Sequence, residues 1–202
     1  MLSKFGVTGL LLVYSAHLFR YYHETGHSIE STPFFEEVQS IAEELKLLVP
    51  TITDDESSER SASKIKLDQM IAETHHNLGC IGTETNKPEF TLKHFKIFNK
   101  MMMAETERGA KKDKRVSVSW NELGNAYMMN KMWAPGEECF KESMRTARLM
   151  DDFEPTDLSF PYVNLGLAYW LTRRLDEAEQ TLLEGLRIRE AAYGVDDTQS
   201  FM

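Results

Sequence analysis

"WNELGNAY" at residues 120–127 is the clearest of three related stretches in this chain of 202 residues. The other two are "HHNLGCIG" at 75–82 and "YVNLGLAY" at 162–169. Each contains Leu-Gly at the same place, and the three glycines are 45 and then 42 residues apart. A short stretch that recurs at a nearly constant period is the signature of a repeat protein, in which each repeat is one supersecondary unit. The predicted repeats cover about residues 72–105, 117–150 and 159–192.

The spacing within each stretch predicts a helix. Trp120, Leu123, Gly124 and Tyr127 follow one another at i, i+3, i+4 and i+7, which places them on one helical face. Glycine inside a helix costs about 1 kcal/mol relative to alanine, so three glycines in the same phase indicate that a second helix packs closely there. A small residue follows each glycine after 12 residues, and a bulky one follows after 16: these are Thr91, Gly136 and Ala178, then Phe95, Phe140 and Leu182. We expect the small residues to face the glycines across two antiparallel helices.

This pattern resembles the tetratricopeptide repeat, Trp-x2-Leu-Gly-x2-Tyr followed by Ala-x3-Phe. The second and third copies match it closely, whereas His75 and Gly82 replace the two aromatic residues in the first. The long period and "LRIREAAYGVDDTQS" at 186–200 resemble the branch found in kinesin light chains and in the arrays of fungal signalling ATPases. The resemblance covers about residues 70–200. It implies an all-α fold, a right-handed α-solenoid of antiparallel helix pairs.

The segments around the repeats suggest three regions. Residues 1–48 are expected to form an N-terminal helical pair, a degenerate repeat or cap, because Thr32-Pro33 is typical of a helix start. Residues 49–63, "VPTITDDESSERSAS", are expected to be a polar linker. The repeat array then covers 64–202 and ends in an incomplete start of a next repeat. Because an array without a polar capping helix exposes an apolar flank, we expect a homodimer through the C-terminal repeat, a covering partner, or a truncated array.

The resemblance also suggests where a partner binds. In the family, the first helix of each pair lines a concave groove. The matching positions here are His76, Asn77, Asn121, Asn125, Met128, Met129, Asn164, Leu167, Trp170 and Leu171. None of them is Lys or Arg, so the family's clamp for carboxylate tails is not expected. The positions change from polar to apolar along the array, which suits an extended or helical peptide. Alternatively, Trp170 and Leu171 pack against a further repeat or a second copy.

The sequence contains few motifs that indicate an enzyme or a binding site for a cofactor or a metal ion. The chain contains no phosphate-binding loop, no nucleophile elbow and no dinucleotide fingerprint, so we expect no catalytic residue and no cofactor. His76 and Cys80 share a helical face, but zinc needs three or four convergent ligands, so no metal site is expected. An enzyme or metal-binding protein built on that pair is the alternative of another class. A net charge of −9 and a pI near 5.2 argue against nucleic-acid binding.

The predicted function is therefore a non-enzymatic scaffold that captures a peptide or partner helix in its groove. A regulatory sensor array related to nucleotide-switch ATPases is the alternative. The apolar run within residues 1–16 is far shorter than the ~20 residues of a membrane span. We accordingly expect a cytoplasmic protein without membrane contact, with a weak secretory signal at residues 1–16 as the alternative.

Overall fold

The computed structural model describes residues 58–107, 114–150 and 152–194, together with Thr25, Glu37 and Ser40. The predicted N-terminal pair at 1–48 thus lies outside the described residues, apart from those three positions. The chain divides into two compact units, Met1–Leu78 and Gly79–Met202. Helix α3 (Ser58–Glu84) runs from the first unit into the second, and it begins inside the segment 49–63 expected to be a linker.

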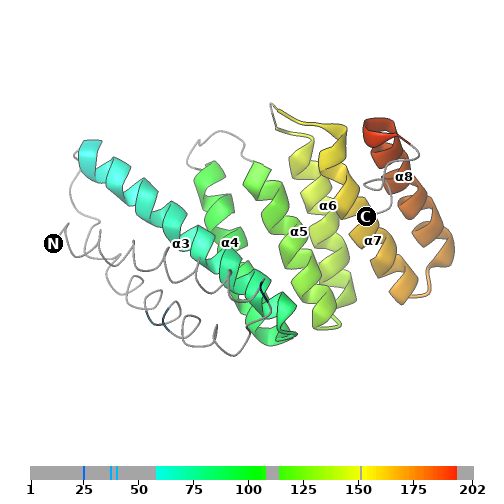
Figure 1. The fold of residues 1–202 in the computed structure, drawn as a ribbon, viewed down its shortest axis with the longest axis horizontal. Coiled ribbons are helices and arrows are strands. Elements are labelled where there is room, and N and C mark those ends of the chain that lie inside the picture. Colours follow the sequence, from blue (N-terminus) through cyan, green and yellow to red (C-terminus); the bar gives the residue numbers. More distant parts are fainter. Residues whose placement is uncertain are drawn as a thin grey trace. The chain divides into compact units, whose positions relative to one another are not determined.

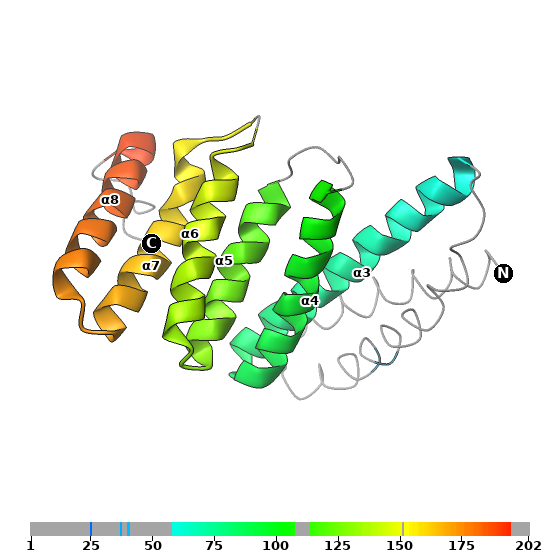
Figure 2. The same cartoon turned by 180° about the vertical axis from the view of Figure 1, so that it is seen from behind.

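The second unit consists of helices joined by short turns. After the end of α3 come α4 (Pro88–Glu107), α5 (Lys114–Met129), α6 (Trp133–Ala147), the 3-10 helix η2 (Pro155–Leu158), α7 (Ser159–Leu171) and α8 (Leu175–Tyr193). Figure 1 shows α5 beside α6 and α7 beside α8, and Figure 2 shows the same order from behind. No strand occurs in the described ranges. The predicted all-α fold of antiparallel helix pairs is confirmed.

Close packing within each pair depends on the repeated glycine. A β-carbon placed on Gly124 would lie 2.5 Å from the Phe140 ring on α6, and one on Gly166 would lie 2.6 Å from Leu182 on α8. Gly79 has the same relation to Phe95, at 2.4 Å. The predicted close approach is therefore present. In the second pair the small residue also lies close, because a β-carbon on Gly136 would be 3.3 Å from the Gly124 carbonyl oxygen, but the nearest side chain to each glycine is the bulky residue 16 positions later.

The turn inside each pair is also repeated, and the sequence analysis did not identify it. Asn86, Lys131 and Arg173 each follow the glycine by seven residues, and all three have a positive φ, between 52° and 65°. In each turn the next residue's N–H donates to the carbonyl five residues earlier, with N···O distances of 2.8 to 2.9 Å. This is the Schellman motif, which ends a helix with one left-handed residue. Three identical turns give the three pairs the same geometry.

Contacts between successive pairs are apolar in the centre and polar at the edges. One buried cluster joins α6, α7 and α8: Phe140, Met144, Ala147, Met150, Leu158, Leu165, Ala168, Tyr169 and Ala178. At its edge the Arg174 guanidinium forms a 2.6 Å ion pair with Glu137 of the preceding pair and lies over the Tyr169 ring. In the turn after α5, the Asn130 amide donates to the carbonyl of Pro88 at 2.7 Å. The pairs are thereby held in fixed register.

Candidate partner-binding surface

Helix α7 carries a line of exposed apolar side chains on one face. Five residues share one face of this helix, and we call the set the α7 stripe: Phe160, Asn164, Leu167, Trp170 and Leu171. Its four apolar members are all exposed, with Phe160 at 60% and Trp170 at 53% of full accessibility. Asn164 is half-buried. Exposed apolar patches of this kind usually mark an interaction surface.

The corresponding positions on α5 are more covered. The Asn164 amide on α7 donates to the side-chain oxygen of Asn121 on α5 at 3.0 Å, and Asn121 is buried. Met128 is half-buried and packs against the core formed by α6, α7 and α8. Its sulfur would lie 2.9 Å from a β-carbon on Gly136. Asn125 and Met129 are half-buried. The accessible part of the predicted groove thus lies mainly on α7.

Glu122 adds a carboxylate beside these amides. Burial raises the pKa of Glu122, while hydrogen bonds from the side chains of Asn125 and Asn121 partly oppose that shift. A carboxylate with little access to water requires such donors. Together with Asn164, these residues form a polar cluster next to the apolar stripe. Within the cluster, the Asn164 amide donates to Asn121, and the Asn121 and Asn125 side chains hydrogen-bond Glu122.

The other predicted groove residues belong to the first unit. His76 and Asn77 are half-buried on α3, within Met1–Leu78. The surface described above is made by the second unit alone. Among the described residues, no group of three or more His, Cys, Asp or Glu side chains lies close enough together to hold a metal ion.

The two cysteines differ in their surroundings. Cys80 is half-buried, whereas Cys139 is buried on α6. Burial raises the pKa of the Cys139 thiol to about 12, and the nearby carboxylates of Glu138 and Glu142 add to the shift. Because the thiolate is the reactive form, the raised pKa leaves little reactive Cys139 thiolate at neutral pH. None of the described helices is long and apolar enough to cross a membrane.

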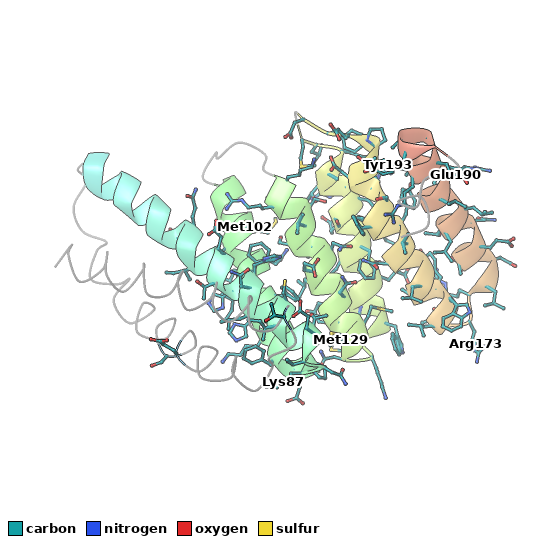
Figure 3. All side chains as sticks on the ribbon, in the orientation of Figure 1. Lys87, Met102, Met129, Arg173, Glu190 and Tyr193 are labelled. Atoms are coloured by element: carbon teal, nitrogen blue, oxygen red, sulfur yellow. The ribbon has the colours of Figure 1, made fainter. Side chains whose placement is uncertain are left out.

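Figure 3 shows how these elements are oriented in the second unit. The turns within the pairs occur at one end of the helices, and the labelled residues Lys87, Met129 and Arg173 lie there. Glu190 and Tyr193 lie at the opposite end of the helices. Met129 and the Trp170–Leu171 part of the α7 stripe are therefore at the turn end of their helices. Phe160 is at the other end of α7, toward the last turns of α8.

One family model and several solved structures are similar to this chain. Residues 162–199 match the sequence profile of the tetratricopeptide repeat. The chain is similar to a crystal structure of the Podosopora anserina putative kinesin light chain with nearly identical TPR-like repeats, with 17% identity, a TM-score of 0.43, and coverage of 90% of this chain and 96% of that chain. It is also similar to BtubC from P. vanneervenii, with 14% identity, a TM-score of 0.39, and coverage of 96% of this chain and 94% of that chain. No curated protein sequence matches.

The third repeated stretch and the α7–α8 pair therefore form a tetratricopeptide repeat. The resemblance predicted from the sequence is confirmed, most directly for residues 162–199. The α5–α6 pair shares its close-packed glycine and its Schellman turn with α7–α8, so it has the same architecture. The class of protein that this fold defines is the helical-repeat protein built of antiparallel helix pairs.

Proposed function

We propose that this protein is a non-enzymatic scaffold that captures a peptide or helical segment of a partner protein along the α7 stripe. The observation that carries the proposal is the exposure of Leu167, Trp170 and Leu171 directly beside the hydrogen bond from Asn164 to Asn121. Apolar contact area and backbone-directed amides then lie together on one surface. Peptide-binding grooves combine these two features.

The two parts of the surface have different roles in this proposal. Trp170 is the anchor, because large aromatic residues supply most of the binding energy of protein interfaces. Asn164, Asn125 and Glu122 hydrogen-bond the backbone of the captured segment and set its register. Selectivity comes from the apolar side chains that the segment presents to Leu167 and Leu171.

Peptide display against the purified chain tests the proposal. The affinity of a selected, fluorescently labelled peptide is measured by anisotropy for the wild type, Trp170→Glu and Leu167→Glu. Leu149→Glu is the matched control, since Leu149 is 46% exposed and Leu167 is 47% exposed, yet Leu149 lies outside the stripe. We expect each stripe variant to bind at least about tenfold more weakly, equivalent to 1.4 kcal/mol, and the control to bind normally. Equal affinities for Leu167→Glu and Leu149→Glu would contradict the proposal.

Self-association through the same region is the second candidate. It is favoured because most of the exposed large apolar residues described lie on α7 and α8: Phe160, Leu167, Trp170, Leu171, Leu175, Leu182, Leu183 and Tyr193. Light scattering over a range of concentrations measures the mass of the wild type and of Trp170→Glu. A dimer that dissociates in the variant would support self-association. A monomer in both cases would exclude it and leave the peptide proposal.

A further inference from the structure

The last turns of α8 contain a buried arginine that forms no ion pair with any other residue the structure describes. Arg189 is 8% exposed, and its Nε atom is buried with no hydrogen-bond acceptor. No carboxylate among the described residues forms an ion pair with it. Its guanidinium lies over the ring of Phe160, with 5.3 Å between Cζ and the ring centroid. A buried cation is strongly unfavourable unless it is paired, so one aromatic ring satisfies this group only in part.

The repeat shows that packing does not require an arginine at this position. Arg189 follows the glycine of its repeated stretch by 23 residues. The equivalent residues in the two earlier copies are Met102 and Ala147, and both are buried apolar residues. An apolar side chain at this position is therefore sufficient for packing between the helices. The third copy places a permanent positive charge in a core position.

The surroundings of Arg189 place this charge at one end of the α7 stripe. Phe160 begins the stripe and is its most exposed member. One turn before Arg189, the backbone of Gly185 lies against Tyr162 and Val163 of α7, so closely that a β-carbon on Gly185 would be 3.2 Å from Tyr162. A second cation is near, because the Arg148 guanidinium donates to the Tyr162 hydroxyl at 3.2 Å. Arg189 and Arg148 therefore each contact a residue in the first turn of α7, while the Asp157 carboxylate just before α7 is paired with Lys114.

We propose that Arg189 and Phe160 form a carboxylate-binding subsite for an acidic side chain of the captured partner segment. This inference rests on the proposed function. The guanidinium N–H groups donate to the carboxylate, a charge-assisted bond that is stronger than a neutral one. The Phe160 ring covers the aliphatic part of the same partner residue.

The position of the subsite predicts where along the partner segment the acidic residue lies. Phe160 and Leu171 are eleven residues apart, so the two ends of the stripe are separated by about 16 Å at 1.5 Å per residue. A partner segment should carry Asp or Glu at that distance from the residue that packs on Trp170 and Leu171. This corresponds to about three helical turns, or about five residues in an extended strand.

Acetate is a probe of the subsite that does not depend on peptide capture. The Nε–Hε resonance of Arg189 is followed by NMR during titration with sodium acetate at constant ionic strength, with sodium chloride and acetamide as references. We expect a saturable shift with acetate and none with chloride or acetamide. The resonance is assigned by its loss in Arg189→Met, a variant that restores the side chain found at Met102. No saturable shift, or an equal shift with chloride, would overturn the subsite.

Two variants test whether the acetate-induced shift arises from acetate bound at Arg189. Arg187→Gln changes another arginine of α8, which is exposed and lies 3.5 Å from Glu184, and it should leave the acetate shift of Arg189 unchanged. The double variant Asp196→Asn, Asp197→Asn removes the two carboxylates that follow α8 in the sequence. A shift that arises only in this double variant would show that the chain's own carboxylate occupies the site, and would overturn the proposal.

A display-selected peptide separates the subsite from the proposed function. We expect Arg189→Met to weaken an acidic peptide about tenfold, and to leave unchanged the affinity of the same peptide with its acidic residue replaced by Gln. Loss of affinity in Leu167→Glu with none in Arg189→Met would overturn the subsite and retain the proposed function. Unchanged affinity in both variants would overturn both.

Discussion

Replacing the glycine of the second and third repeats by alanine tests the packing argument. Gly124 and Gly166 occupy the same place in their pairs, but the side chains that they contact differ in freedom. Phe140 is fully buried, whereas Leu182 is exposed by more than a third of its surface. The same substitution should therefore have opposite effects in the two repeats.

The magnitudes follow from two opposing terms. A β-carbon on Gly124 would lie 2.5 Å from the Phe140 ring, about 1 Å closer than the ~3.5 Å of a normal contact. Overpacking in a core of this kind costs about 1–3 kcal/mol, and replacing a helical glycine by alanine returns about 1 kcal/mol. We expect Gly124→Ala to lower the free energy of unfolding by about 0–2 kcal/mol, toward the upper end because the buried ring cannot move aside. Gly166→Ala should raise it by about 0–1 kcal/mol, because Leu182 can rotate toward water.

Urea denaturation monitored by far-UV circular dichroism measures both effects. At the upper limit of about 2 kcal/mol, the loss in Gly124→Ala corresponds to a fall in Tm of about 4–8 °C for a chain of this size. The double variant Gly124→Ala, Phe140→Leu should recover part of the loss, since the smaller side chain leaves room for the methyl group. If Gly166→Ala were destabilised as much as Gly124→Ala, the freedom of the facing side chain would not be the cause, and the reasoning would fail.

Two further predictions concern the turn and the thiol. Lys131→Gly should raise the free energy of unfolding by about 0.5–1 kcal/mol in urea titrations, because Lys131 has a φ of 58° and glycine adopts this conformation without strain. Asn86→Gly is the control and should change little, since asparagine tolerates the left-handed region. For Cys139, the pKa of about 12 lies above the ordinary value of the unfolded thiol, so the folded state holds its proton more tightly. The contribution of the Cys139 thiol to stability is complete below about pH 8.5 and is lost as the pH rises toward 12. The urea midpoints of wild type and Cys139→Ala should therefore diverge above about pH 9. Midpoints that change in parallel with pH would contradict this prediction.

Much of the fold follows from the phase of a few residues. Leu123, Gly124 and Tyr127 define one helical face, and Phe140 lies at the distance along the chain where a second helix returns. The helix pair was predictable for this reason. Which residue faces Gly124 was not, because the offset of two packed helices depends on the turn that joins them. That turn depends on the left-handed conformation of Lys131, a residue whose type does not favour it.

The candidate surface was only partly predictable. Trp170 and Leu167, which the repeat phase predicts for the groove, are exposed on α7, whereas Met128 on α5, predicted for the same groove, is half-buried beside Gly136. Arg189 was missed. The repeat phase contained the signal, since an arginine occurs there where Met102 and Ala147 stand in the other copies.

The sequence by itself determined the repeat, the phase of its helices and the residue types on each face, because these depend on spacing along one chain. The tertiary structure alone decided which of those residues are covered. Asn121 is buried because Asn164 of the next pair hydrogen-bonds it, while Trp170 remains exposed on a helix of the same kind. Burial depends on the elements that pack from outside the helix, and helical periodicity contains no information about them.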